Sequence, residues 1–284
     1  MGTFYLLCLF AWVLVGGILT SGETGPSFDQ NYHVVWGSDH VRSVRQGREV
    51  RLAMDKSSGS GIASKLYYGS GIFHMRIKLP GGDTAGVVTA FYLTSGSNAH
   101  DELDFEFLGN LEGQPWFLQT NVFTNGLGNR EQRIRLWYDP AADFHLYSIL
   151  WNEHQIVFFV DKTPIRVFNN KENIGVGYPS QAMQVVTTLW DAEDWATDGG
   201  QIKTNWTQAP FKAYLQGFDI NGCPSNITNS PACHSTKYWW NREQFWSLNP
   251  NQQSAYADVK KNYMTYDYCL DTKRFEKPPP ECPQ

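Results

Sequence analysis

The stretch His100–Gly109, HDELDFEFLG, alternates acidic and apolar residues with a period of two. Successive side chains of an extended strand point to opposite faces, so this segment is predicted to be a strand with two unlike faces. Glu102, Asp104 and Glu106 share one face, and His100 lies at its end. The other face is apolar and is predicted to pack into the core: Leu103, Phe105 and Phe107.

Three carboxylates on one strand face repel each other, which raises the pKa of at least one of them. Cleavage of a glycosidic bond uses such an arrangement, because one carboxylate attacks the sugar while a protonated carboxylic acid gives its proton to the leaving oxygen. A solvated acidic strand edge does not account for three acids at strict alternation, backed by aromatic residues. A metal site is a second alternative, but the sequence has no further cluster of His or Cys to complete a ligand shell. We therefore expect neither a metal nor an organic cofactor.

The composition favours a neutral polysaccharide as the partner of this strand. The chain has 284 residues, of which 15% are aromatic, and its net charge is −5. Aromatic faces bind the C–H faces of pyranose rings, so an excess of Trp and Tyr suits sugar binding. The acidic charge argues against nucleic acid and against a polyanionic substrate.

The amino terminus has the pattern of a secretory signal peptide. Phe4–Leu19 is a nearly unbroken apolar run, followed by the small residues Ser21 and Gly22, although no Lys or Arg precedes it. A transmembrane anchor is the alternative, for which the run is short. We predict a signal peptide at residues 1–22 and a secreted, monomeric mature protein without membrane association.

Cysteines and sequons agree with secretion. Cys8 lies in the predicted signal, and the mature chain keeps four other cysteines: Cys223, Cys233, Cys269 and Cys282. Four cysteines allow three pairings, and these residues alone do not decide between them. The sequons Asn205-Trp206-Thr207 and Asn226-Ile227-Thr228 predict glycosylation at Asn205 and Asn226.

Short β-type segments follow one another up to about residue 220, with Gly, Pro, Ser and Asn at the turns. This spacing, with no helical periodicity before about residue 248, predicts an all-β fold, a curved antiparallel β-sandwich (jelly roll), over residues 23–221. Besides the acidic strand, the predicted strands are residues 50–54, 73–79, 87–93, 116–123, 134–138, 145–151, 156–160, 165–168, 183–189 and 211–220.

Residues 222–284 differ in texture and are predicted to form an extension packed on the same domain. Residues 250–261 are expected to be a short helix, with Asn249 as N-cap and Pro250 at the first helical position. Residues 263–268 could be one more strand. The extension either lengthens a binding cleft or only stabilises the sandwich.

The decapeptide His100–Gly109 resembles the active-site signature of the plant xyloglucan endotransglucosylase/hydrolases, members of glycoside hydrolase family 16. The resemblance extends from about Phe28 to Cys282. It implies that Glu102 is the nucleophile and Glu106 the general acid/base, while Asp104 orients Glu102 and tunes both pKa values. His100 either supports this end of the site or is simply a satisfied histidine.

The resemblance also implies disulfides Cys223–Cys233 and Cys269–Cys282, and an extension that lengthens the acceptor side of the cleft. A loop with Trp190 would supply stacking and close-approach residues. The implied glycan contacts are Glu106, Gln119, Thr120, Asn121, Asn129, Arg130, Glu131, Asp194, Trp195, Gly199, Gly200 and Arg274. In one respect the chain departs from many relatives: Asn110-Leu111-Glu112 directly after the strand is not a sequon.

These features predict a xyloglucan endotransglucosylase of the cell wall and apoplast, which cleaves the β-1,4-glucan backbone and passes the glycosyl-enzyme to another glucan chain. A strict xyloglucan endo-hydrolase, or a transglucosylase that also uses cellulose or mixed-linkage glucan, is the alternative among enzymes. A non-catalytic lectin is the alternative from another class, and the three aligned acids disfavour it because binding alone needs no proton donor.

Overall fold

The structure is a computed structural model that describes residues 25–282. The predicted signal peptide, with Cys8, lies outside the described residues. Within the described part of the chain, no helix is long and apolar enough to cross a membrane.

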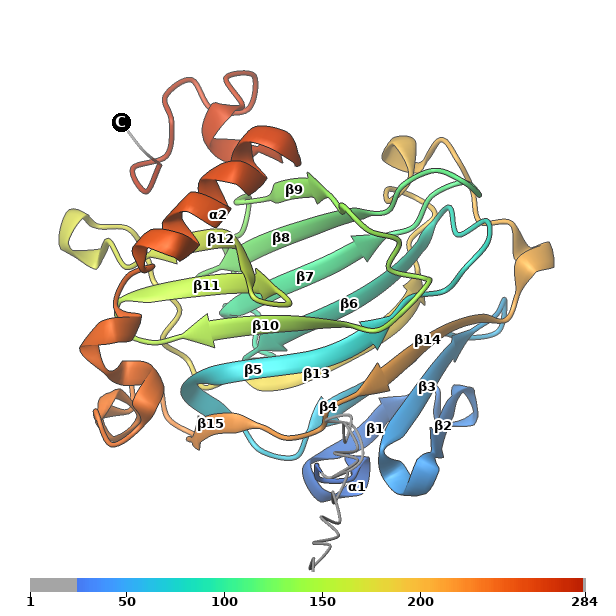
Figure 1. The fold of residues 1–284 in the computed structure, drawn as a ribbon, viewed down its shortest axis with the longest axis horizontal. Coiled ribbons are helices and arrows are strands. Elements are labelled where there is room, and N and C mark those ends of the chain that lie inside the picture. Colours follow the sequence, from blue (N-terminus) through green and yellow to red (C-terminus); the bar gives the residue numbers. More distant parts are fainter. Residues whose placement is uncertain (1–24, 283–284) are drawn as a thin grey trace, which may run out of the picture.

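Two antiparallel sheets pack face to face as a sandwich (Figure 1). The first sheet has eight strands in a row, and the second has seven in a row with one further strand at its side. The first sheet has the order β1-β4-β13-β6-β7-β8-β9-β16: Tyr32–Trp36, Ser60–Ser64, Gln184–Asp191, Val87–Thr94, Glu102–Leu108, Phe117–Phe123, Gln132–Arg135 and Met264–Asp267. The second has the order β12-β11-β10-β5-β14-β3-β2: Thr163–Asn169, Gln155–Val160, His145–Trp151, Tyr68–Lys78, Phe211–Gln216, Glu49–Met54 and Val41–Val44. Strand β15, Asn221–Pro224, pairs with β5 at the side of this order. The predicted antiparallel β-sandwich is confirmed.

The acidic strand is β7, and it lies between β6 and β8 near the middle of the first sheet. Its apolar face packs against the second sheet, as predicted. Phe105 is fully buried and meets the rings of Tyr147 on β10 and Phe158 on β11 edge to face. Burying a side chain of this size stabilises the fold by about 1.5–3 kcal/mol. These contacts fix which face of β7 looks outward, and thus where the carboxylates lie.

The predicted strands occur within a few residues of their expected bounds, and four strands were not predicted: β1, β2, β4 and β15. β9 ends at Arg135 and β14 at Gln216, both earlier than predicted. Before residue 248 the described chain has one α-helix, the single turn α1 at Phe28–Asn31, besides short 3₁₀ turns.

The carboxyl-terminal region joins the sandwich rather than standing apart from it. Helix α2, Pro250–Asn262, starts at a reciprocal cap in which Asn249 and Gln252 bind each other's backbone N–H, and it packs against β12 (Figure 1). The next strand, β16, pairs with β9 and becomes an edge of the first sheet. Disulfides join Cys223 to Cys233 and Cys269 to Cys282.

The two sequons differ in exposure. The Asn226 side chain lies on an exposed loop. Asn205 is half-buried, and its amide Nδ2 donates to Asp83 Oδ2 at 3.3 Å. Glycosylation of either residue stays a prediction.

Candidate active site

The outward face of β7 forms the floor of a cleft of about 450 Å³. Strand register sets which residues flank each acid: Asp104 lies between Tyr92 on β6 and Asn121 on β8. Glu106 lies between Ala90 and Gln119. The cleft is lined by Ala90, Tyr92, Glu102, Asp104, Glu106, Gln119, Asn121, Phe123, Glu131, Thr188, Trp190 and Trp195.

Asp104 is the most buried of the three acids, with 5% of its surface exposed. Burial, together with the negative charges of Glu102 and Glu106, raises the pKa of Asp104 well above its usual range. Asp104 and Glu102 are joined by a side-chain hydrogen bond. The raised pKa of Asp104 favours its protonated form, which can donate to Glu102 in that bond.

Glu106 is also held toward its protonated form. Burial is the main cause that raises the pKa of Glu106, and the charge of Glu102 adds to it. A short chain of hydrogen bonds acts the other way: Gln119 Nε2 donates to Glu106 Oε2 at 2.8 Å, and an Arg133 amino group donates to Gln119 Oε1 at 2.8 Å. The cleft therefore holds two carboxyl groups, Glu102 and Glu106, on one strand face, and the buried Glu106 can carry a proton. Retaining glycoside cleavage needs a carboxyl nucleophile and such a proton donor.

His100 lies at the end of this face, as its position in the sequence predicts. Its Nε2 is 3.9 Å from Glu102 Oε1, beyond hydrogen-bond distance, and its Nδ1 is 3.1 Å from the Ser97 carbonyl oxygen. The ring also packs against Phe123, with centroids 5.2 Å apart. Both interpretations of His100, support of the site or a satisfied histidine, stay open.

Two tryptophans form one wall of the cleft. The rings of Trp190, at the end of β13, and Trp195, in the following loop, have centroids 6.1 Å apart. The loop turns back through Gly200, whose φ is +84° and where a Cβ would lie 2.0 Å from the Asp194 carbonyl oxygen. Gly199 and Gly200 thus shape the loop and do not line the cleft. The Asp194 side chain points to solvent and forms an ion pair with Lys203.

A second hollow of about 690 Å³ shares Gln119, Glu131 and Trp195 with the cleft and continues it toward β16. Arg274 lines this hollow, and one of its amino groups donates to Glu131 Oε2 at 2.6 Å. Its other amino group donates to the Asn129 side-chain oxygen. Three predicted glycan contacts, Asn129, Glu131 and Arg274, are therefore brought together.

Two predicted glycan contacts point elsewhere. Thr120 pairs with Phe105 and shares its inward face, where the guanidinium of the buried Arg166 donates to the Thr120 hydroxyl at 3.0 Å. Arg130 binds Glu281 at 2.7 Å and the Leu127 carbonyl oxygen at 2.9 Å, and it does not line either hollow. The Thr120 side chain faces inward because of its strand parity, and the Arg130 side chain ties down the carboxyl-terminal tail. Contact of either residue with a glycan stays a prediction.

Several residues that line the cleft or the hollow beside it were not predicted, above all Tyr92 in the cleft and Arg133 and Tyr266 in the hollow. Burial and the charges of Glu102 and Asp104 raise the pKa of Tyr92, so its hydroxyl is available as a donor. The alternating pattern of β6 is a signal that the Tyr92 side chain faces outward. The register of β6 on β7, which places Tyr92 beside Asp104, leaves no such signal in the sequence. No group of three His, Cys, Asp or Glu side chains within residues 25–282 is arranged to hold a metal ion.

Comparison with known proteins places this cleft in a family. The model of glycosyl hydrolases family 16 matches residues 28–208, and that of the xyloglucan endo-transglycosylase C-terminus matches residues 234–282. The chain belongs to the xyloglucan endotransglucosylase/hydrolases of this family. It is 53% identical to xyloglucan endotransglucosylase/hydrolase protein 2 of Arabidopsis thaliana over 98% of this chain and 96% of the relative. It is 57% identical to the putative protein 1 of the same plant, over 90% of this chain and 86% of that one.

Solved structures of other proteins share the sandwich. Apo Crh5 transglycosylase superposes with a TM-score of 0.59 at 24% identity, over 77% of this chain and 90% of that one. The Bacillus licheniformis beta-glucanase gives a TM-score of 0.55 at 21% identity, over 69% and 92%. At these identities the likeness concerns the fold. Family membership makes the chain a glycoside-cleaving or glycosyl-transferring enzyme, as predicted.

Proposed function

We propose that this protein is a secreted, retaining xyloglucan endotransglucosylase that acts in cell-wall construction and remodelling. The observation that carries the proposal is the pair of unlike acids on β7: Glu102, held in a hydrogen bond by Asp104, and Glu106, whose buried carboxyl favours the proton. The family supplies the substrate class, because the relatives it groups with are named for xyloglucan.

In the first step, Glu106 gives its proton to the glycosidic oxygen while the Glu102 carboxylate attacks the anomeric carbon. The carbon–oxygen bond breaks, and the leaving chain departs with a new hydroxyl group. Glu102 then carries the donor fragment as an ester, and Glu106 is ionised. Asp104 acts on Glu102 by orienting its carboxylate.

In the second step, a hydroxyl of an acceptor glucan loses its proton to Glu106 and attacks the anomeric carbon. The ester bond breaks, so Glu102 is restored as a carboxylate and Glu106 as an acid. Water in place of the acceptor gives hydrolysis. The product therefore depends on which hydroxyl is held over the intermediate.

The hollow that continues the cleft favours transfer over hydrolysis. Trp195 borders both spaces and offers a partly exposed ring, and Arg274 and Glu131 add polar groups beside it. A glucan chain bound there would place its hydroxyl near Glu106 at a high effective concentration. A strict endo-hydrolase is the rival within the same chemistry, and use of cellulose or mixed-linkage glucan is a variation on it.

The test is incubation with xyloglucan and a labelled xyloglucan oligosaccharide, scored for label in polymer and for new reducing ends. Label should enter the polymer with few net reducing ends. Trp195→Ala should weaken acceptor use more than donor cleavage. Trp246→Ala is the matched control, because Trp246 is similarly exposed and lines neither space. Steady accumulation of reducing ends without labelled polymer would identify a hydrolase, and binding without either product would identify a lectin.

A further inference from the structure

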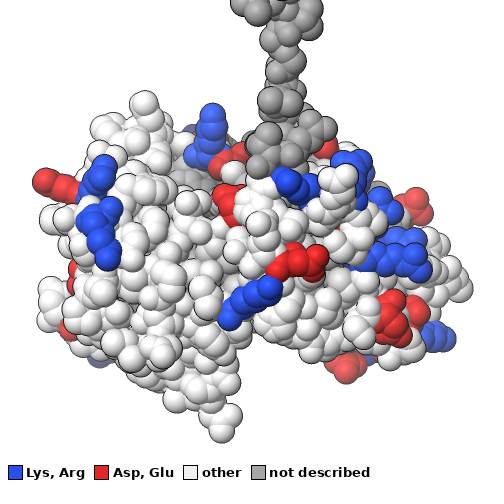
Figure 2. Space-filling view, turned by 90° about the horizontal axis from the view of Figure 1, so that it is seen from below, with Lys and Arg blue, Asp and Glu red and all other residues white. Residues whose placement is uncertain are grey.

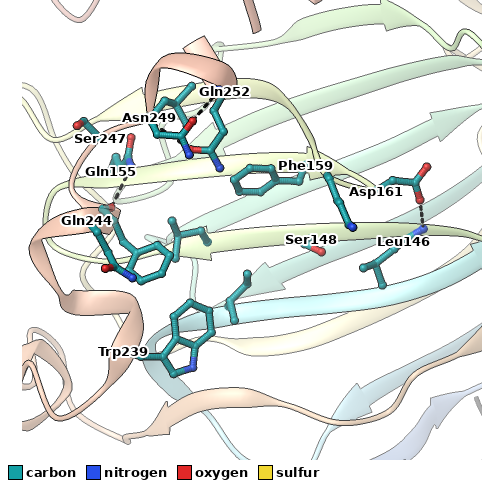
Figure 3. Close-up of a pocket in the computed structure, with 15 residues that line it drawn as sticks. Leu146, Ser148, Gln155, Phe159, Asp161, Trp239, Gln244, Ser247, Asn249 and Gln252 are labelled. Carbon is teal, nitrogen blue, oxygen red and sulfur yellow. Dashed lines mark hydrogen bonds between the residues drawn. The ribbon is translucent and has the colours of Figure 1, made fainter. Parts of the chain in front are cut away.

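A further cavity, of about 600 Å³, lies apart from the cleft and its continuation, on the outer face of the other sheet (Figure 3). Its floor is formed by side chains of β5, β10 and β11, and segment 239–252, which leads into α2, covers one side. The segment is held down by buried amides: Asn152 Nδ2 donates to the carbonyl oxygens of Trp240 and Phe245, at 2.8 and 3.1 Å. The cavity is thus formed by anchored elements and has the size of a small-molecule site.

The lining is mainly apolar, unlike that of the cleft on β7. Aliphatic and aromatic side chains contribute from both the sheet and the covering segment: Ile72, Leu146, Leu150, Phe159, Trp239 and Leu248. Neither the three carboxylates of β7 nor the pair Trp190 and Trp195 lines this space. A flat apolar ring matches such walls better than a hydroxyl-covered sugar does.

One buried polar atom in the lining has no partner. Gln155 is 1% exposed, and its Nε2 donates to the Phe245 carbonyl oxygen at 3.0 Å. That bond fixes the orientation of the amide, because a carbonyl oxygen can only accept. Gln155 Oε1 is left as a buried acceptor with no hydrogen-bond donor among the described residues. An unpaired buried acceptor is costly, so a ligand O–H group here would gain the bond that the protein leaves unmade.

The opposite end of the cavity carries a cation. Gln155 and Asp161 lie at opposite ends of the lining (Figure 3), and Lys162 follows Asp161 in the turn after β11. Asp161 is already engaged, since it accepts from the Leu146 N–H at 3.0 Å and lies 3.0 Å from His145 Nδ1. Within residues 25–282, Lys162 forms no ion pair. An anionic ligand group can therefore meet an unpaired ammonium.

We propose that this cavity binds a phenolic carboxylic acid. The aromatic ring lies among Leu150, Phe159 and Trp239, the phenol O–H donates to Gln155 Oε1, and the carboxylate pairs with Lys162. The site is on the sheet opposite to the cleft, so the proposal does not depend on the activity proposed above.

The probe is 4-hydroxycinnamate, titrated into the full-length mature protein by calorimetry. We expect one site with a dissociation constant on the order of 0.1–1 mM, given the size of the probe. Cinnamate lacks the phenol hydroxyl and should bind about tenfold more weakly. Lys162→Met should weaken 4-hydroxycinnamate about threefold, as for a partly exposed ion pair. Lys212→Met is the matched control, because Lys212 is an exposed lysine on β14 of the same sheet outside the cavity.

The proposal is overturned by absence of binding, by equal affinity for cinnamate and 4-hydroxycinnamate, or by equal effects of the two lysine variants. A xyloglucan oligosaccharide without hydroxycinnamate should not displace the probe, since it binds the other face. Displacement of the probe by the oligosaccharide would show that the two ligands share a site, and this result would also overturn the proposal. Ser148→Phe, which places a ring at the floor of the cavity, should abolish binding in a variant that keeps its near-ultraviolet circular dichroism.

Discussion

Among single residues, Glu102 and Glu106 share a strand face but differ in what surrounds their carboxyl groups. Glu102→Gln keeps the size of the side chain and removes the nucleophile, so cleavage and transfer should both fall by orders of magnitude with the fold intact. Glu106→Gln should lose about 10²–10⁴-fold with natural donors. Azide should partly rescue Glu106→Gln only with a donor whose leaving group needs no protonation. Near-normal activity of Glu102→Gln in the labelled-acceptor assay would contradict the assignment.

Asp104 should lower stability at neutral pH while it serves the site. The pKa of Asp104 is raised in the folded protein, so the folded state favours the protonated form. Its favourable contribution is complete below the pKa of an unfolded Asp, about 3.9, and is lost as the pH rises through the folded-state value. Asp104→Asn should therefore raise the unfolding free energy at pH 7 relative to the parent, with the difference vanishing below about pH 4. Denaturant titrations at the two pH values test this, and a destabilised variant at pH 7 would refute the buried-acid account.

Arg133 should set the alkaline limit of activity. Its charge lowers the pKa of Glu106, and its amino group holds the oxygen of Gln119. Arg133→Met removes that charge, so the pKa of Glu106 should rise and the alkaline limb of the pH profile of kcat/KM should move to higher pH. Arg135→Met, an exposed position on the same strand, should leave the limb in place. A shift to lower pH would mean that Glu106 is not the acid.

At the scale of elements, alternation was enough to predict β7, its two faces and most of the strands beside it. It was not enough for β4, because Ser60–Ser64 contains little alternation. Gly61 in this strand allows close approach of the Trp36 ring, since a Cβ at this position would lie 2.2 Å from the Trp36 indole nitrogen. Contacts between segments distant in sequence, such as Arg130 with Glu281, leave no local pattern either. The same parity rule that located the acids places the Thr120 side chain on the inward face, between its neighbours Gln119 and Asn121.

The disulfide Cys269–Cys282 should matter more to acceptor use than to the sandwich. It closes the loop that contains Arg274 and retains Glu281, the partner of Arg130. By chain entropy the bond favours the folded form of this tail by about 3 kcal/mol, and this effect acts on the segment after β16 rather than on the two sheets. Replacing both cysteines by Ala should speed proteolysis within residues 269–282 and weaken acceptor binding, while the main melting transition changes little. The same change at Cys223 and Cys233 is the control, since that pair lies far from Arg274 in sequence, and equal loss of acceptor use in both variants would contradict the prediction.

At the scale of the whole molecule, charge is spread thinly. Figure 2 shows acidic and basic side chains interspersed over one face, with much of it uncharged. A neutral glucan has no charge for salt to screen, so kcat/KM for xyloglucan should change less than about twofold between low and high salt. A carboxymethylated xyloglucan is the control, because the carboxylates of the cleft should repel it and added salt should raise its rate. A steep salt dependence with the neutral donor would point to a charged partner instead.

The pairing of β16 with β9 has a consequence for how the protein is made. β16 is the last strand of the chain, and β13 is inserted between β4 and β6, so the sheet that bears the acids joins early and late segments. A nascent chain released before Met264 leaves β9 as an open edge, which can pair with the same edge of another copy. Such long-range pairings also form slowly. We therefore expect truncated chains that end before residue 264 to self-associate and to bind chaperones. In the 284-residue chain, β16 pairs with β9 and covers this edge.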